Sequence, residues 1–168
     1  VVHGFVDNPV ISTTWIEEDW GRMPEATGEV AIDRHLNDEL GIEIGDEVTV
    51  VLNGTRLNLT VTGYANHPAH LWYVPSKDSF LPGEGVFAVL YMPIDDLTNA
   101  LNLSVETRNT MLIDVVGTPD YDLQDTFEDE GERLEVLRKS LEVSLQAEGI
   151  EDAQLEDRSG MDSVELLR

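Results

Sequence analysis

Two histidines close together in the chain, His67 and His70, are the residues whose type and spacing first suggest metal chemistry. Imidazole nitrogens are common ligands of zinc, and two of them three residues apart can share one ion on a helix face. Pro68 stands between them and disfavours a regular helix over this stretch. No third ligand accompanies the pair at a fixed spacing. We therefore predict that these histidines belong to an ordinary loop, and we assign no metal ligand and no cofactor.

The sequence also lacks a complete set of catalytic residues. No serine stands in a Gly-x-Ser-x-Gly elbow, and no base and orienting acid are arranged around one. Adjacent carboxylates such as Asp95 and Asp96 do not face each other on a helix, so they do not make a glycosidase pair. The acidic run 120–130 lacks the glycine and glutamate positions of a calcium-binding EF-hand. We predict no catalytic residue and no enzymatic activity.

The charge balance restricts the partners of this chain. Its 168 residues contain 34 Asp and Glu against 10 Lys and Arg, a formal net charge of −24. A nucleic acid or an anionic lipid surface requires a cationic face, so the charge disfavours both as partners. No apolar run is long enough to span a membrane. An acidic surface poor in lysine suits a salt-loving source, and it equally suits an acidic extracellular domain from an ordinary organism.

The elements that must position any site begin with a short strand and a short helix. Residues 30–32 are rich in β-prone side chains. Asp33 is a suitable N-cap for a helix that ends at Leu40, and Gly41 is suited to the C′ position. The sequence therefore predicts a strand that passes directly into a capped helix.

A β-hairpin is predicted next along the chain. The runs 48–52 and 57–61 are β-prone, and Asn53-Gly54 separates them. Asn-Gly is the strongest short-range hairpin signal, because both turn residues adopt positive φ. In the second run apolar and polar residues alternate, which predicts a strand with one buried face.

The second half of the chain predicts strands and helices in alternation. Residues 86–92 form a buried strand, and Pro93 opens a helix over 94–101. Residues 111–116 and 150–157 are expected to be further strands. A long helix lies between these two, with leucines at helical spacing on one face. Those leucines are Leu134, Leu137, Leu141 and Leu145.

These elements predict an α+β fold of two lobes in a single domain fragment. A β-rich lobe spans about 26–85. An α/β lobe combines about 1–25 with 86–168, so the two ends of the chain meet in it. The long connection 64–85 has no regular period and contains prolines and most of the aromatic residues, and long loops in compact domains are usually functional or mobile.

Aromatic and apolar residues gather on that connection, and they are candidates for contact with a partner. The candidates are Leu71, Trp72, Tyr73 and Phe80. The alternative is that the same side chains fold back onto the domain's own core. The sequence leaves these two interpretations open.

Several segments taken together resemble one protein family. The stretches ATGEVAID (26–33) and LGIEIGDEV (40–48) are similar to the "GEV…lgl..GD.V" region of FtsX-like ABC-transporter permeases. Gly21-Arg22 with Pro24 is similar to the segment that precedes this region in the family. Further on, FAVLYMP (87–93) also looks like the family, and so does the closing RSGMDSVELLR (158–168). The resemblance covers about residues 20–168 and lies in the family's MacB-like periplasmic core domain.

The resemblance implies a non-enzymatic domain on the extracytoplasmic side of a cell membrane. Such a domain has a porter-like α/β sandwich lobe and a smaller mostly-β lobe, and it transmits ATPase-driven motion while contacting a substrate or partner protein. The implied partners are its own transmembrane helices, a cytoplasmic ABC ATPase subunit, a second permease copy or homologue, and an extracytoplasmic partner protein. The alternative is a free-standing extracellular ligand-binding or hydrolytic module.

Overall fold

The computed structural model describes residues 1–6, 14–67, 70, 87–110, 112, 127–150 and 153–155. The chain divides into two compact units, Val1–Ile113 and Asp114–Arg168. The first unit contains a β-sheet with two short helices, and the second contains one long helix. The chemistry described below belongs entirely to the first unit.

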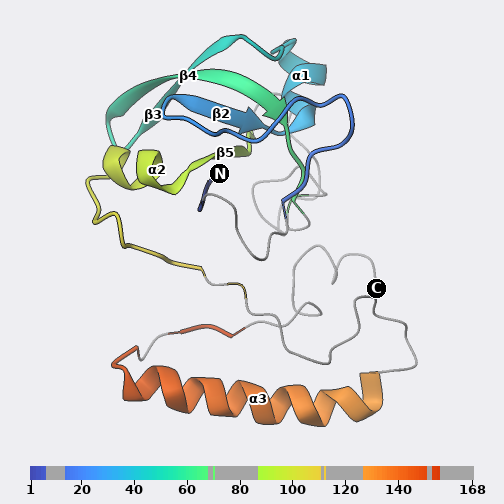
Figure 1. Ribbon diagram of the computed structural model, residues 1–168, viewed down its shortest axis with the longest axis vertical. Helices are drawn as coiled ribbons and strands as arrows, with labels where there is room; N and C mark the ends of the chain where they lie inside the picture. Colours follow the sequence, from blue (N-terminus) through green and yellow to red (C-terminus); the bar gives the residue numbers. More distant parts are fainter. Residues whose placement is uncertain are drawn as a thin grey trace. The chain divides into compact units, whose positions relative to one another are not determined.

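One mixed β-sheet of five strands forms the frame of the first unit, with the strand order β1-β5-β2-β4-β3 (Figure 1). The pairs β1/β5 and β2/β4 are parallel, whereas β2/β5 and β3/β4 are antiparallel. The α+β class predicted from the sequence is confirmed. The strands are β1 (Val2–Phe5), β2 (Glu29–Ile32), β3 (Glu47–Leu52), β4 (Thr55–Tyr64) and β5 (Leu90–Pro93).

The first helix, α1 (Arg34–Leu40), begins and ends as its sequence predicts. The Asp33 side chain accepts a hydrogen bond from the backbone N–H of His35 at 3.2 Å. Gly41 adopts a left-handed conformation with φ 67° and ends the helix. Asp33, the N-cap residue, is only 1% exposed, so its polar side chain is buried with its hydrogen bond satisfied.

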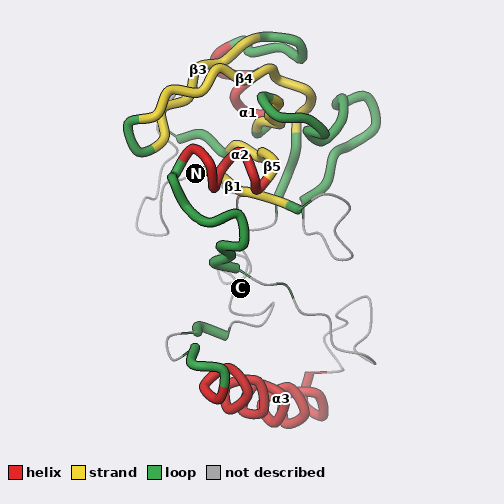
Figure 2. Tube along the Cα trace, turned by 60° about the vertical axis from the view of Figure 1, so that its left-hand side comes forward, coloured by secondary structure: helices red, strands yellow, loops and turns green. Residues whose placement is uncertain are grey.

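The second helix, α2 (Ile94–Ala100), follows Pro93 directly, as predicted. Two acidic residues, Asp95 and Asp96, lie in its first turn, where the helix dipole favours negative charge. The helix packs against β1 and β5, and Figure 2 shows it beside these two strands. Glycine at position 4 of β1 lets this helix pack closely, because a Cβ there would lie 2.6 Å from the Ile94 Cδ1 atom and 3.3 Å from the Ile94 Cα atom.

The predicted hairpin is confirmed. Asn53 and Gly54 both have positive φ, 47° and 81°, as a tight two-residue turn between twisted strands requires. The flanking strands pair in register from Leu52 and Thr55 at the turn to Glu47 and Thr60 at the far end.

One strand is shorter than the sequence predicts. The apolar run 86–92 was expected to be a strand throughout, but β5 begins only at Leu90. Within the preceding residues, Val89 is fully buried and its carbonyl accepts a hydrogen bond from the backbone N–H of Asp33 at 3.0 Å. An apolar run indicates burial, and burial here is achieved without strand pairing.

Strands from both predicted lobes lie in the same sheet. β1 and β5 belong to the predicted α/β lobe, and β5 pairs with β2 of the predicted β-rich lobe. The division into two lobes is therefore not shown by the described residues.

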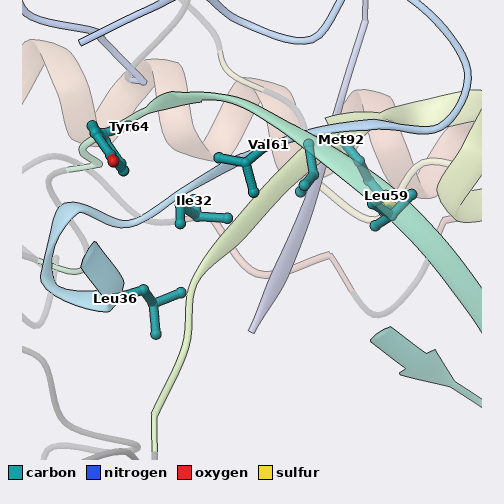
Figure 3. Packing of buried hydrophobic residues seen from close by; sticks show 7 residues of the cluster. Ile32, Leu36, Leu59, Val61, Tyr64 and Met92 are labelled. Atoms are coloured by element: carbon teal, nitrogen blue, oxygen red, sulfur yellow. The ribbon is translucent and has the colours of Figure 1, made fainter. Parts of the chain in front are cut away.

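Both faces of this sheet are covered by apolar side chains. Alternation along β2 places Val30 and Ile32 on one face and Ala31 on the other. The first cluster, shown in Figure 3, contains Val30, Ile32, Leu36, Leu59, Val61, Tyr64 and Met92. The second cluster contains Ala31, Ala65, Phe87, Val89 and Tyr91.

The second unit is described mainly by α3 (Phe127–Ala147). The predicted leucine face is partly confirmed, since Leu137, Leu141 and Leu145 are half-buried, whereas Val136 on another face is 67% exposed. Gly149 has φ 82°, as expected for a residue just past a helix. Within the part of the chain that the structure describes, no helix has the length and apolarity to cross a lipid bilayer.

Two further predicted strands lie largely outside the described residues. Of 111–116 only Leu112 is described, and of 150–157 only 150 and 153–155 are. None of these described residues is in a strand. The backbone N–H of Ile150 instead donates to the carbonyl of Leu145 at 2.9 Å, which closes the end of α3.

Candidate functional site

Three histidines from distant parts of the chain meet on one face of the sheet. His3 lies in β1, whereas His67 and His70 follow β4. The Nε2 atoms of His3 and His70 are 2.7 Å apart, which is a hydrogen bond. The His3 ring stacks on that of His67 at a centroid distance of 5.0 Å. We call these three residues the histidine cluster.

The strand register places the histidine cluster against the second apolar cluster. His3 pairs with Tyr91 across the parallel β1/β5 ladder, so their side chains share a face. Their rings stack with centroids 5.5 Å apart. The His70 ring lies 6.0 Å from the ring of Phe87, which is 8% exposed. The imidazoles are therefore embedded among aromatic rings rather than held out in solvent.

This environment disfavours the charged form of every imidazole in the histidine cluster. Burial lowers the pKa of His67 from its ordinary 6.5 to about 4, and the nearby His3 lowers it further. The pKa of His70 falls to about 4 for the same reasons, with His67 adding to the effect. Burial also lowers the pKa of His3. All three side chains are therefore neutral at pH 7.

A neutral histidine cluster of this kind can bind and release protons. The contact between His3 and His70 needs one imidazole to donate its Nε2–H and the other to accept. Among the described residues, no three His, Cys, Asp or Glu side chains have an arrangement that could hold a metal ion. The expectation that the chain binds no metal stays a prediction.

Sequence reasoning found two members of the histidine cluster and missed the third. It singled out His67 and His70 as a pair without a third partner. His3 supplies that partner from 64 positions earlier in the chain, through the pairing of β1 with β5. No local pattern around His3 signals this, because the contact depends on strand order.

A second set of polar contacts, around Arg22, lies among residues that resemble the family. The Arg22 guanidinium donates to both carboxylate oxygens of Glu29, at 2.6 and 2.8 Å. The same carboxylate accepts from the backbone N–H groups of Glu25 and Ala26 at 2.9 and 3.2 Å. Bidentate pairs of this geometry are among the stronger ion pairs in proteins. The hydrogen bond from Arg22 is the main reason that the pKa of Glu29 falls from 4.5 to about 2.

This ion pair gives a testable prediction. In Arg22→Ala the Glu29 carboxylate loses its main stabilising partner, and its pKa should rise from about 2 towards 4.5. Because this pKa is lowered in the folded state, the pair stabilises the fold above pH 4.5, and that stability is lost as the pH falls towards 2. Side-chain carboxyl NMR shifts measured against pH check it. Arg56→Ala, at an exposed position of β4, is the control and should leave Glu29 unchanged; a Glu29 pKa near 4.5 in the parent contradicts the prediction.

The adjacent carboxylates considered for catalysis have a structural role in part. Asp96 accepts a hydrogen bond from the backbone N–H of Gly28 at 2.9 Å, which ties α2 to the start of β2. The acidic run 120–130 lies mostly outside the described residues. The partner-contact candidates Leu71, Trp72, Tyr73 and Phe80 also lie outside the described residues, so both interpretations of that loop stay open.

Known proteins give no further guide to identity. Comparison of the chain with protein-family models, with curated proteins and with solved structures found no match.

Proposed function

We propose that this chain is the extracytoplasmic part of an FtsX-like ABC-transporter permease, acting as a non-enzymatic mechanical domain. In this role it transmits the motion of a cytoplasmic ATPase to a substrate or partner protein outside the cell membrane. A single observation about the residues that resemble the family carries the proposal. The stretches 26–33 and 40–48 are both hydrogen-bonded to the same strand, β4.

The first stretch, 26–33, and the segment that precedes it are both hydrogen-bonded to β4. The backbone N–H of Arg22 donates to the carbonyl of Thr62 at 3.0 Å, and that of Thr60 donates to the carbonyl of Gly28 at 2.8 Å. A Cβ at Gly63 would lie 2.6 Å from the Arg22 carbonyl oxygen. The two backbones are thus as close as glycine allows, which explains why this position requires glycine.

The second stretch is fastened in the same way. The backbone N–H of Gly45 donates to the carbonyl of Val61, and the N–H of Val61 donates to the carbonyl of Asp46, both at 2.8 Å. The Asp46 side chain accepts from the backbone N–H of Glu43 at 2.9 Å and shapes the turn. The described residues of these two stretches thus form one hydrogen-bonded frame with β4, and such a frame suits a force-transmitting domain.

The proposal includes the finer arrangement and partners that the resemblance implies. These are a porter-like α/β sandwich lobe with a smaller mostly-β lobe, transmembrane helices of its own, an ABC ATPase subunit and a second permease copy or homologue. A cationic partner protein also suits the net charge of −24.

The location of the domain can be tested with a cysteine label, since the chain contains no cysteine. Thr55→Cys places an exposed thiol beside the β3–β4 turn in the full-length gene product. We expect a membrane-impermeant maleimide to label it in intact cells, in the membrane fraction, with an ABC ATPase subunit co-purifying. Val61→Cys is the matched control on the same strand, because Val61 is 1% exposed and should react only after denaturation.

Two outcomes would reject this proposal. Labelling of Thr55→Cys only after cell lysis would place the domain on the cytoplasmic side. Recovery of the whole gene product from the culture medium, without a membrane-bound form, would favour the free-standing extracellular module instead.

A further inference from the structure

The histidine cluster connects the edge strand β1 to the segment that follows the interior strand β4. β1 is four residues long, all of them half-buried, and it pairs with β5 alone in the strand order. β1 contributes His3 to the cluster, and the other two members, His67 and His70, follow β4. Short edge strands have few backbone hydrogen bonds, so side-chain contacts matter more to them than to central strands.

The hydrogen bond between His3 and His70 depends on the protonation state of the two imidazoles. A neutral imidazole has one N–H donor and one acceptor nitrogen, whereas a charged imidazolium has two donors and no acceptor. The 2.7 Å contact between the Nε2 atoms of His3 and His70 therefore exists only while one of the two rings is neutral. When both rings are charged, two N–H groups and two positive charges face each other.

Among the described residues, the side chains in contact with His3 are aromatic rings, and none of them is a carboxylate that could balance added positive charge. The charged or titratable groups that face His3 are His67, His70, the Tyr91 phenol and the Val1 ammonium, which donates to the Ala88 carbonyl at 2.6 Å. Phe87, on the far side of His70, is apolar. Burial is the largest cause of all three lowered pKa values, and neighbouring positive charge lowers them further.

We propose that the histidine cluster is a pH-sensitive joint, in which acid charges the imidazoles and separates His67 and His70 from His3, loosening the edge strand β1. This property is independent of the proposed transport role. It requires only that the three rings stay in contact when neutral and repel when charged.

The pH range follows from the direction of the shifts. A histidine whose pKa is lowered in the folded state stabilises the fold above its unfolded pKa, 6.5, and that stability is lost as the pH falls towards its folded pKa. For His67 and His70 the folded pKa is about 4. Their proton affinity in the closed joint is therefore roughly 300-fold weaker than that of a free imidazole. Acid between pH 6.5 and 4 thus favours the open joint.

An NMR titration of the full 168-residue chain from pH 8 to 3.5 at constant salt tests the proposal. We expect His67 and His70 to take up protons near pH 4 and the amide signals of Val2–Phe5 to shift with the same midpoint. The amides of Thr49–Val51 lie in β3 at the opposite edge of the sheet, and they should not follow. Imidazoles that titrate near 6.5, or β1 signals that do not follow them, overturn the proposal.

A substitution separates the joint from general acid effects. His3→Phe keeps an aromatic ring against Tyr91 but removes one titrating partner. We expect the His67 and His70 midpoints to rise and the acid-dependent shift of the β1 signals to disappear. If His3→Phe does not fold, His70→Phe removes the other partner of the 2.7 Å contact and should abolish the same shift. A variant whose β1 signals keep the parent's acid midpoint overturns the proposal.

The fourth histidine supplies the matched control. His35 is not a member of the histidine cluster: it lies in α1, where its Nε2 donates to the Phe87 carbonyl at 2.8 Å. His35→Gln removes this imidazole and retains a side-chain N–H donor. The titration of His67 and His70, and the response of β1, should match the parent. Loss of the β1 response in this variant would show that His35 controls the edge strand and would overturn the assignment to the histidine cluster.

Discussion

Ile32→Ala should destabilise the first unit by about 2–5 kcal/mol, a large share of the 5–15 kcal/mol of a typical domain. Ile32 is 1% exposed at the end of β2, and it pairs with Tyr64 of β4 and Leu90 of β5. It also belongs to the apolar cluster in Figure 3. Removing three carbons there leaves a cavity between strands that cannot readily move together.

Urea unfolding followed by tryptophan fluorescence measures this change. All three tryptophans of the chain fall within the first unit, so the signal reports on the sheet. Val51→Ala is the matched control, because Val51 lies in the edge strand β3 and is 60% exposed. It should change the free energy of unfolding by no more than about 0.5 kcal/mol. Equal losses in the two variants would contradict the placement of the core.

Added salt should raise the stability of the whole chain markedly. A formal net charge of −24 on 168 residues makes the compact state repel itself. Salt screens exposed charges beyond about 10 Å at 0.1 M and beyond about 3 Å at 1 M. A relief of only about 2 kcal/mol shifts the melting temperature of a chain of this size by roughly 4–8 °C. Thermal melts between 0.05 and 2 M NaCl check the prediction.

Charge reversal at exposed positions separates screening from other effects of salt. Glu17 and Glu18 are exposed, so Glu17→Lys with Glu18→Lys reduces the net negative charge without disturbing the sheet. This double variant should melt at a higher temperature than the parent in 0.05 M NaCl, and it should gain less from added salt. A parent midpoint that stays flat or falls with salt contradicts the prediction.

The local elements could be predicted from the sequence because each depends on residues close together in the chain. Asp33 caps α1 through a hydrogen bond to His35, two residues away, and Gly41 ends the same helix through its own φ. The β3–β4 hairpin needs only that Asn53 and Gly54 adopt positive φ. In each case the interactions that form the element involve only a few neighbouring residues, so the local sequence pattern is sufficient to predict the element.

The tertiary structure alone decided what joins these elements. Ile32 of β2 pairs with Leu90 of β5, 58 positions later in the chain, and this antiparallel pairing brings the strands of both predicted lobes into one sheet. Apolar runs record that a segment is buried but not which strand lies beside it. For the same reason Phe87 and Val89 are buried without belonging to β5.

The same division holds for the histidine cluster. Its two nearby members, His67 and His70, were visible as a pair in the sequence, and His3 was not. The low proton affinity of all three arises from burial and from their mutual contact, and both exist only after β1 has paired with β5. The sequence determines which titrating groups a chain has, whereas the pKa of each group depends on the charges and apolar side chains that the fold places around it.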